Sequence, residues 1–189
     1  MTRNPRQPPE PLRLFVAAYP PLGLAREMVA RATAMDLPRH RATPAEQVHL
    51  TLQFIGEREA GEVAAVLESV RRSAAGLTAF TLGAIRLMTL PRRGAARLVA
   101  AEISSPPALL ELHRRLAHRL AREPRERAGD RFTPHMTLLR LGSAAPGLGV
   151  DLPLNLEPFE VREVLLMKSW LRPDGAVPAE VARVALGAG

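Results

Sequence analysis

The chain has 189 residues, no cysteine and a formal net charge of +7. This length is enough to bury a substantial core in one large domain or two closely packed lobes, and we favour one compact bilobal unit. The lack of cysteine excludes disulfides, thiolate nucleophiles and thiolate metal sites. No stretch has the length and uninterrupted apolar character of a signal peptide or a membrane span, so we expect a cytoplasmic protein that does not contact a membrane.

Hydrophobic periodicity and turn residues predict the following elements in chain order. After a flexible, proline-rich segment at 1–11, a single domain is expected over 12–189. Its elements are a strand at 12–18, a helix at 22–35, a strand at 47–55, a helix at 59–74, strands at 78–88 and 96–103, a helix at 106–122, a strand at 131–141, a surface loop at 142–153, and strands at 159–171 and 178–186 separated by a turn at 172–175. Strands and helices mix without regular alternation, which predicts an α+β fold with mainly antiparallel sheets.

A four-residue motif occurs twice, as His49-Leu50-Thr51-Leu52 and as His135-Met136-Thr137-Leu138. Each copy lies in a predicted strand, where side chains alternate between two faces. In both copies the histidine and the threonine therefore share one face, while the apolar residues form the other. By this alternation Phe54, two positions after Leu52, is expected in the core and not as a base-stacking surface.

The motif belongs to a longer internal repeat. The two histidines are 86 positions apart, and the similar segments at 13–17 and 97–101 are 84 positions apart. An apolar helical pattern lies between the segment and the motif in each half. Each half therefore consists of a strand, a helix and a strand that carries His-x-Thr, and we expect the two halves to build one active site.

Two histidines and two threonines on facing strands suit a displacement at phosphorus. One neutral imidazole can take a proton from an attacking water while a protonated imidazole gives one to the leaving oxygen. Each threonine hydroxyl can donate a hydrogen bond to a non-bridging phosphate oxygen. A metal is not expected, because His-x-Thr offers one ligand per strand without a carboxylate at ligand spacing.

The two motifs and their flanks resemble the 2H phosphoesterase superfamily, and more closely its RNA 2′,3′-cyclic phosphodiesterases, historically named 2′-5′ RNA ligases. The residues that carry the resemblance are Leu14-Phe15-Val16-Ala17, the segment from His49 to Glu57, and the segment from Phe132 to Arg140. The chain departs from the family at Lys168 before Ser169, where an acidic or amide residue is usual, and at Pro178, where an aromatic residue is common.

The resemblance implies two lobes related by a pseudo-two-fold axis, with a cleft between them. It implies hydrolysis of a terminal 2′,3′-cyclic phosphate on RNA to a 2′-phosphomonoester, without metal or cofactor and with reversible 2′-5′ ligation as a related activity. His49 would be the proton donor and His135 the proton acceptor, while Thr51 and Thr137 would hold the phosphate. The implied partner is RNA with a cyclic phosphate end, such as a tRNA fragment, bound by a monomer.

Arginine dominates the basic residues, because Lys168 is the chain's one lysine. The excess suits a polyanion such as RNA, but a general bias toward Ala, Arg, Gly and Pro explains it equally well. Arg140 either anchors phosphate or caps its strand, and Arg97 is a weaker candidate for RNA contact. Loop residues Arg92 and Arg93 are candidates of the same kind. His40, His113 and His118 lie outside the repeated motif, and His113 and His118, on the predicted helix at 106–122, are assigned surface or packing positions.

Two other functions stay open. The same site could act on 2′-5′-linked oligonucleotides or small cyclic nucleotides, or the protein could be a non-catalytic RNA-binding module that grips phosphate. A purely structural alternative has His49 and His135 hydrogen-bonded to each other in a polar core.

Overall fold

The computed structural model describes residues 11–121, 132–172 and 175–187. The predicted segment at 1–11 therefore falls almost entirely outside the described residues, as do two residues of the predicted turn at 172–175. The described elements are β1 (Leu12–Ala18), α1 (Leu22–Thr33), β2 (His40–Ala42), a 3₁₀ turn (Ala45–Gln47), β3 (Leu50–Arg58), a 3₁₀ turn (Ala60–Glu62), α2 (Val63–Ala74), β4 (Phe80–Leu82), β5 (Ala84–Leu90), β6 (Ala96–Ile103), α3 (Pro107–Leu120), β7 (His135–Ala145), β8 (Asp151–Pro153), β9 (Phe159–Val161), β10 (Glu163–Arg172) and β11 (Gly175–Ala185).

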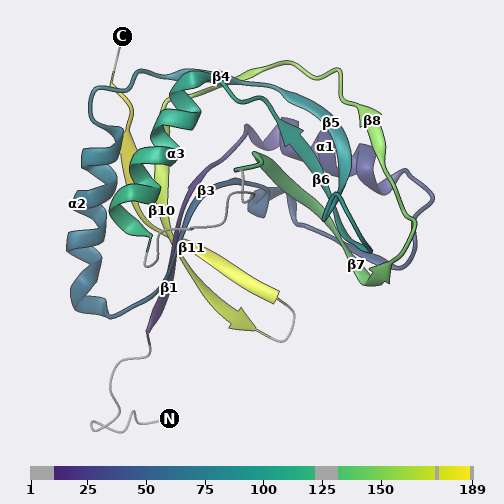
Figure 1. The fold of residues 1–189 in the computed structure, drawn as a ribbon, viewed down its shortest axis with the longest axis horizontal. Helices are drawn as coiled ribbons and strands as arrows, with labels where there is room; N and C mark the ends of the chain where they lie inside the picture. The colour runs from purple at the N-terminus through teal and green to yellow at the C-terminus, as the bar shows by residue number, and fades with distance from the viewer. Residues whose placement is uncertain (1–10, 122–131, 173–174, 188–189) are drawn as a thin grey trace, which may run out of the picture.

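One curved sheet organises the molecule (Figure 1). Its main path runs β11-β10-β1-β3-β7-β6-β5-β8, and β2 adds to β7 as a ninth strand. All of these strand pairs are antiparallel, and a small separate sheet joins β4 to β9. The α+β class with mainly antiparallel sheets is therefore confirmed.

The two halves of the sheet meet at the repeated motif. Strands β3 and β7 share the pair Leu50 and Met136, which are the second residues of the two motif copies. The strand order on either side of this pair is also matched, because β1 is the next neighbour of β3 and β6 is the next neighbour of β7. Equivalent residues thus meet at the centre of the sheet, as a pseudo-two-fold axis requires.

Both motif strands carry a β-bulge directly after the threonine. Thr51 lies opposite Ala17 and Thr137 lies opposite Ala100, and in each strand the following leucine has no cross-strand partner in the register. A bulge inserts one residue and increases the local twist of the strand. Because the two bulges are equivalent, each half presents its histidine and threonine in the same local geometry.

The bulge at Leu52 overturns the expectation for Phe54. Thr51 pairs with Ala17 and Phe54 with Phe15, which share a face of β1, so the inserted Leu52 shifts the alternation by one and moves Phe54 to the face of Thr51. A second bulge follows at Ile55, which stays on the buried face: Phe54 is 69% exposed and Ile55 is 3% exposed. The prediction that Phe54 lies in the core is wrong, since strict alternation does not foresee a bulge.

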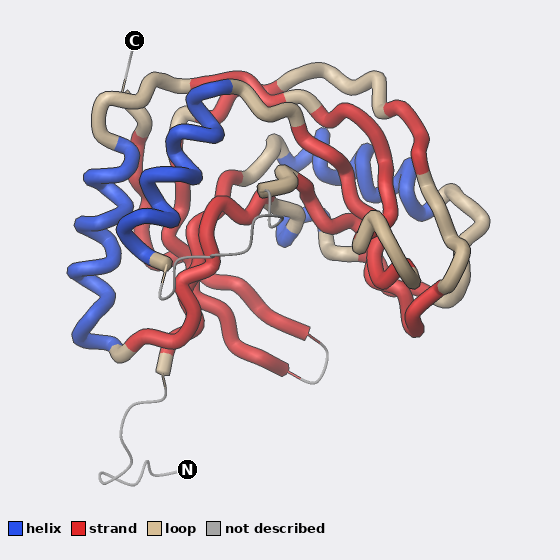
Figure 2. Tube along the Cα trace, viewed as in Figure 1, coloured by secondary structure: helices blue, strands red, loops and turns tan. Residues whose placement is uncertain are grey.

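The helices interlock the two halves. Helix α1 follows β1 in the chain but contacts β7, while α3 follows β6 but contacts β3. Figure 2 shows α2 and α3 side by side on one half of the sheet and α1 on the other. Leu109, Leu112 and Leu116, on the predicted apolar face of α3, are fully buried in one core cluster with residues from both halves.

Most predicted elements are confirmed within a few residues, and the segment at 142–153 is the main exception. It was expected to be a surface loop, but β7 continues through Ala145 and β8 covers Asp151–Pro153, pairing with β5. Glycine and alanine are poor indicators of strand structure, and here the pairing with neighbouring strands decides the conformation. Gly147, with φ of 75°, makes the turn that separates the two strands.

Candidate active site

The two motif histidines are held in the same way. His49 lies directly before β3 and its Nδ1–H donates to the carbonyl oxygen of Gln47 at 2.6 Å, while the Nδ1–H of His135 donates to that of Thr133 at 2.8 Å. A carbonyl oxygen can only accept, so Nδ1 carries the hydrogen in each ring. Nε2 is then the nitrogen available for proton transfer in both histidines.

The motif side chains gather on one face of the central strands. Leu50 and Met136 are fully buried on the opposite face, and the histidine and threonine beside each of them are half-buried. Since β3 and β7 run antiparallel, the residue before Leu50 lies on the side of the residue after Met136. His49 therefore lies on the side of Thr137, and His135 on the side of Thr51.

Burial and neighbouring charges both lower the pKa of His49. Burial is the largest cause that lowers its pKa from the ordinary value, and the charges of Arg140 and His135 lower it further, against the hydrogen bond to Gln47. The ring of Phe15 lies 5.2 Å from the imidazole and that of Tyr19 lies 5.4 Å from it, measured between centroids. These aromatic rings remove water from His49 and so favour its neutral form.

The residues beside the two histidines differ between the halves. Glu102 of β6 pairs in register with His135, and Tyr19, one position after the Ala18 that pairs with Leu50, occupies the equivalent place beside His49. Glu102 binds Arg86 and Arg92 at 2.5 Å each. The site is thus symmetric in its histidines and threonines, but it is aromatic on one side and ionic on the other.

Tyr19 carries a buried polar atom close to the site. Its hydroxyl is buried and finds no hydrogen-bond partner within the described residues. Burial, and to a lesser extent the charge of Glu180, raises the pKa of this phenol to about 12.

Sequence reasoning missed Phe15 and Tyr19 as neighbours of His49, although their spacing in an alternating strand indicates that they share a face.

The four arginine candidates differ in where they lie and in what they bind. Arg140 is exposed and lies within β7. Because the strand continues for five more residues, Arg140 does not cap its end. The charge of Arg140 contributes to lowering the pKa of His49. Arg97 is exposed in a bulged part of β6. Arg92 is bound to Glu102, and Arg93 is exposed in the adjoining loop.

The remaining histidines lie apart from the motif pair. His113 of α3 stacks on Phe132 with centroids 3.9 Å apart and donates through Nδ1–H to the carbonyl oxygen of Leu52, which confirms its packing role. His40 binds the carbonyl oxygen of Pro38 at 2.8 Å at the edge of the sheet. His118 lines a surface pocket with several arginines.

The residues the structure describes contain no cluster of three or more histidine or acidic side chains placed to hold a metal ion. The expectation that catalysis needs no metal stays a prediction. Across the same described part of the chain, none of the helices combines the length and apolarity needed to cross a bilayer.

The fold and the paired His-x-Thr strands are those of a two-histidine phosphoesterase. The chain belongs to the 2′-5′ RNA ligase superfamily, whose family model matches residues 20–168. This confirms the family predicted from the two motifs. The matched range includes both motif segments that carried the resemblance, with their histidines and threonines, but it begins after Leu14-Phe15-Val16-Ala17.

The relatives agree with this assignment. An RNA 2′,3′-cyclic phosphodiesterase of Geobacillus stearothermophilus is 28% identical over 169 residues, which are 82% of this chain and 52% of the relative. The chain therefore spans about half the length of this curated relative. A crystal structure from Thermus thermophilus matches with TM-score 0.75 at 28% identity, covering 92% of this chain and 97% of the other. E. coli LigT complexed with 3′-AMP matches with TM-score 0.76 at 27% identity, covering 94% and 99%.

Proposed function

We propose that this protein hydrolyses the terminal 2′,3′-cyclic phosphate of RNA to a 2′-phosphomonoester, by acid and base catalysis without a metal. The observation that carries the proposal is the matched pair of histidines, each with Nδ1 bound to the carbonyl oxygen two residues earlier and Nε2 available. A phosphate between the two rings would have an attacking water on one side and the leaving oxygen on the other, as in-line displacement requires. The name of the Geobacillus relative supports the substrate class.

In this mechanism His135 accepts a proton from water as its oxygen bonds to phosphorus, and His49 donates a proton to the 3′ oxygen as the bond from phosphorus to that oxygen breaks. Thr51 and Thr137 donate hydrogen bonds to the non-bridging oxygens, whose negative charge grows in the transition state. If a 5′ hydroxyl takes the place of the attacking water, the bond from phosphorus to the 3′ oxygen breaks in the same way and a 2′-5′ linkage forms. Cleavage of that linkage back to the cyclic phosphate exchanges the two histidine roles, so the proposed site would also support reversible 2′-5′ ligation.

The lowered pKa of His49 bears on its role as the donor. In the free protein, burial favours the neutral ring, which cannot donate from Nε2. A bound cyclic phosphate brings a negative charge next to the ring and favours the protonated form. We infer that substrate binding itself protonates His49, so that the acid forms where it is needed.

The expected setting of the activity follows from the same site. The half-buried motif face would receive the end of an RNA chain, such as a tRNA fragment, and Arg140, near enough for its charge to act on His49, would bind the phosphate. Because each helix packs on the motif strand of the other half, we propose that 12–189 acts as one bilobal unit. We expect the protein to be a monomer and to act in the cytoplasm.

The test is hydrolysis of an oligoribonucleotide ending in 2′,3′-cyclic phosphate, with a chelator present and with the 2′- and 3′-phosphate products resolved. We expect the wild-type protein to release the 2′-phosphate. His49→Gln and His135→Gln should each lower kcat by about 10² to 10⁴, the contribution typical of a general acid or base. His40→Gln is the matched control, because His40 has the same Nδ1 hydrogen bond but lies outside the motif.

Thermal melting of each variant accompanies the assay. Loss of activity in folded His49→Gln and His135→Gln proteins, with His40→Gln active, would support the mechanism. A folded wild-type protein that releases no product, or whose activity is abolished by the chelator, would overturn it. Equal loss of stability in both motif variants without any wild-type activity would favour a structural histidine pair.

One observation supports a second class of substrate. Solved structures of E. coli LigT, which resemble this chain, hold 3′-AMP, ATP and NADP⁺. A small nucleotide or a 2′-5′-linked oligonucleotide is therefore the alternative substrate for the same histidine pair. Comparing kcat/KM on a cyclic nucleotide, a 2′-5′ dinucleotide and the cyclic-phosphate RNA end decides between them.

A further inference from the structure

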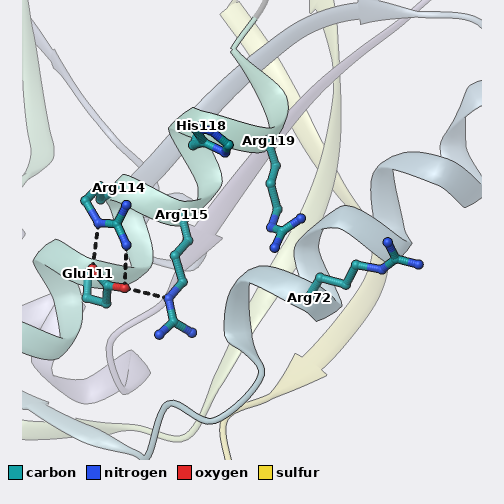
Figure 3. Close-up of a pocket in the computed structure, with 6 residues that line it drawn as sticks. All are labelled: Arg72, Glu111, Arg114, Arg115, His118 and Arg119. Atoms are coloured by element: carbon teal, nitrogen blue, oxygen red, sulfur yellow. Dashed lines mark hydrogen bonds and ion pairs between the residues drawn. The ribbon is translucent and has the colours of Figure 1, made fainter.

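A second basic site lies between α2 and α3. A surface pocket of about 260 Å³ is lined by residues from these two helices (Figure 3). Its lining consists of four arginines, one histidine and one carboxylate, namely Arg72, Arg114, Arg115, Arg119, His118 and Glu111. Figure 3 shows Arg115 and Arg119 extending from α3 on the side that faces α2. The pocket is open to solvent and accessible to a ligand.

Two of the arginines already bind the carboxylate of Glu111 in this pocket. Glu111 accepts hydrogen bonds from Arg114 at 2.7 and 2.8 Å and from Arg115 at 2.7 Å, and these bonds lower its pKa to about 2. Arg115 also donates to the carbonyl oxygen of Ala75, at the end of α2, at 2.8 Å. Two guanidinium groups are thus fixed in place before any ligand arrives, and Arg119 adds charge beside them.

The excess positive charge of the pocket cannot be relieved by proton loss. A guanidinium group stays protonated at any pH a protein tolerates, so like charges brought together by the packing of α2 against α3 repel each other. Basic residues near a helix C-terminus have an ordinary explanation in the helix dipole, which applies to Arg72 and Arg119. Arg114 and Arg115, in the middle of α3, are held at the pocket by their ion pairs to Glu111, and Arg115 also by its bond to Ala75.

The pocket is separate from the histidine pair. Helix α3 contacts β3, and His113 of that helix hydrogen-bonds to Leu52, whose side chain is buried on the face opposite to Thr51. A phosphate group between α2 and α3 therefore lies on the helical side of the sheet. It cannot be the phosphate that reacts between His49 and His135.

We propose that this pocket is a second binding site for phosphate groups, which the arginines hold by charge-assisted, forked hydrogen bonds. An RNA that is bound at its end by the histidine pair and continues around the molecule is one source of such groups. A free phosphorylated ligand is the other source. In both cases the ligand supplies the negative charge that four guanidinium groups beside two carboxylates lack, the second carboxylate being Glu68, which pairs with Arg72 of its own helix at 2.9 Å.

The first experiment locates the site with inorganic pyrophosphate. The side-chain NMR signals of His118 report on the pocket directly, because this residue lines it. We expect them to shift and saturate on titration of the wild-type protein, and the shift to disappear in the double variant Arg72→Ala/Arg119→Ala. Arg71→Ala is the matched control, since it removes the same charge from the neighbouring position of α2 without altering the lining.

The second experiment identifies the source of the phosphate. Binding of a long oligoribonucleotide should weaken about fivefold for each arginine removed, and the slope of log Kd against log salt concentration should fall by about one. Turnover of a dinucleotide cyclic phosphate, which is too short to reach the pocket from the histidine pair, should not change. Pyrophosphate shifts without any effect on RNA binding would assign the pocket to a free ligand and overturn the RNA source.

The proposal is overturned if His118 does not respond to pyrophosphate, or if Arg71→Ala changes the response as much as the double variant does. Neither readout depends on turnover of an RNA end. Failure of the proposed catalytic function would therefore leave the His118 titration intact, and failure of the pocket would leave the hydrolysis assay intact.

Discussion

Leu50 and Met136 pair with each other at the point where the two halves of the sheet meet, and each is the residue between a motif histidine and a motif threonine. This pairing brings the two copies of a repeat that lie 86 positions apart in the chain to a single place. Both side chains are buried, which directs the flanking histidines and threonines to the other face. The active site proposed here is therefore a direct consequence of where the symmetry axis passes through the sheet.

Replacing either motif threonine should impair turnover more than substrate binding. Thr51→Val and Thr137→Val keep the branched shape but remove the hydroxyl donor, and we expect each to lower kcat by about 10²-fold, as loss of a transition-state hydrogen bond does. Thr51→Ser and Thr137→Ser retain the hydroxyl and should recover most of the activity. Steady-state kinetics on the cyclic-phosphate oligonucleotide measures the effect. A rise in KM with unchanged kcat would show that the hydroxyls only bind the ground state.

The stability of the protein should depend on pH through His49. Its pKa in the folded chain is below the ordinary value of about 6.5, so between these two values the unfolded chain binds a proton that the folded chain does not. This contribution to the free energy of unfolding is present above pH 6.5 or so and is lost as the pH falls through the lowered pKa. Urea unfolding across this range should show less pH dependence for His49→Gln than for wild type. Equal pH dependence in the two proteins would contradict the burial argument.

Removal of the Tyr19 hydroxyl should not destabilise the protein. The hydroxyl is buried without a partner in the described residues, and such a group costs about 1 to 3 kcal/mol. We expect Tyr19→Phe to leave the free energy of unfolding unchanged or to raise it by about 1 kcal/mol, while the pKa of His49 stays low because the ring remains. Tyr19→Ala should expose His49 to water and move its pKa back toward the ordinary value. NMR titration of His49 distinguishes the two variants.

The bulge in β3 predicts opposite effects at two consecutive positions. Ile55→Ala should lower the free energy of unfolding by about 2 to 5 kcal/mol, because Ile55 is fully buried. Phe54→Ser should change it by no more than about 0.5 kcal/mol, because the ring is largely exposed. Chemical denaturation of both variants checks the assignment. If Phe54→Ser lowered the free energy of unfolding more than Ile55→Ala does, strict alternation would hold through residue 55.

Sequence reasoning was most successful where the pattern is local. The apolar spacing of Leu109, Leu112 and Leu116 identified α3, and the opening strand at 12–18 has the same bounds in the structure. It failed at Phe54 and at the segment 142–153, because a bulge and an edge pairing depend on the neighbouring strand. Neither leaves a signal in the residues themselves.

The sequence by itself determined the repeat, the class of fold and the four residues most suited to chemistry at phosphorus, because periodicity and residue type are local properties. The tertiary structure alone decided that α1 and α3 pack on each other's motif strands, and that Phe15 and Tyr19 remove water from His49. It also gathered four arginines from two helices around one carboxylate. These features depend on distances between segments far apart in the chain, which are set by how the sheet and helices pack and not by any one segment.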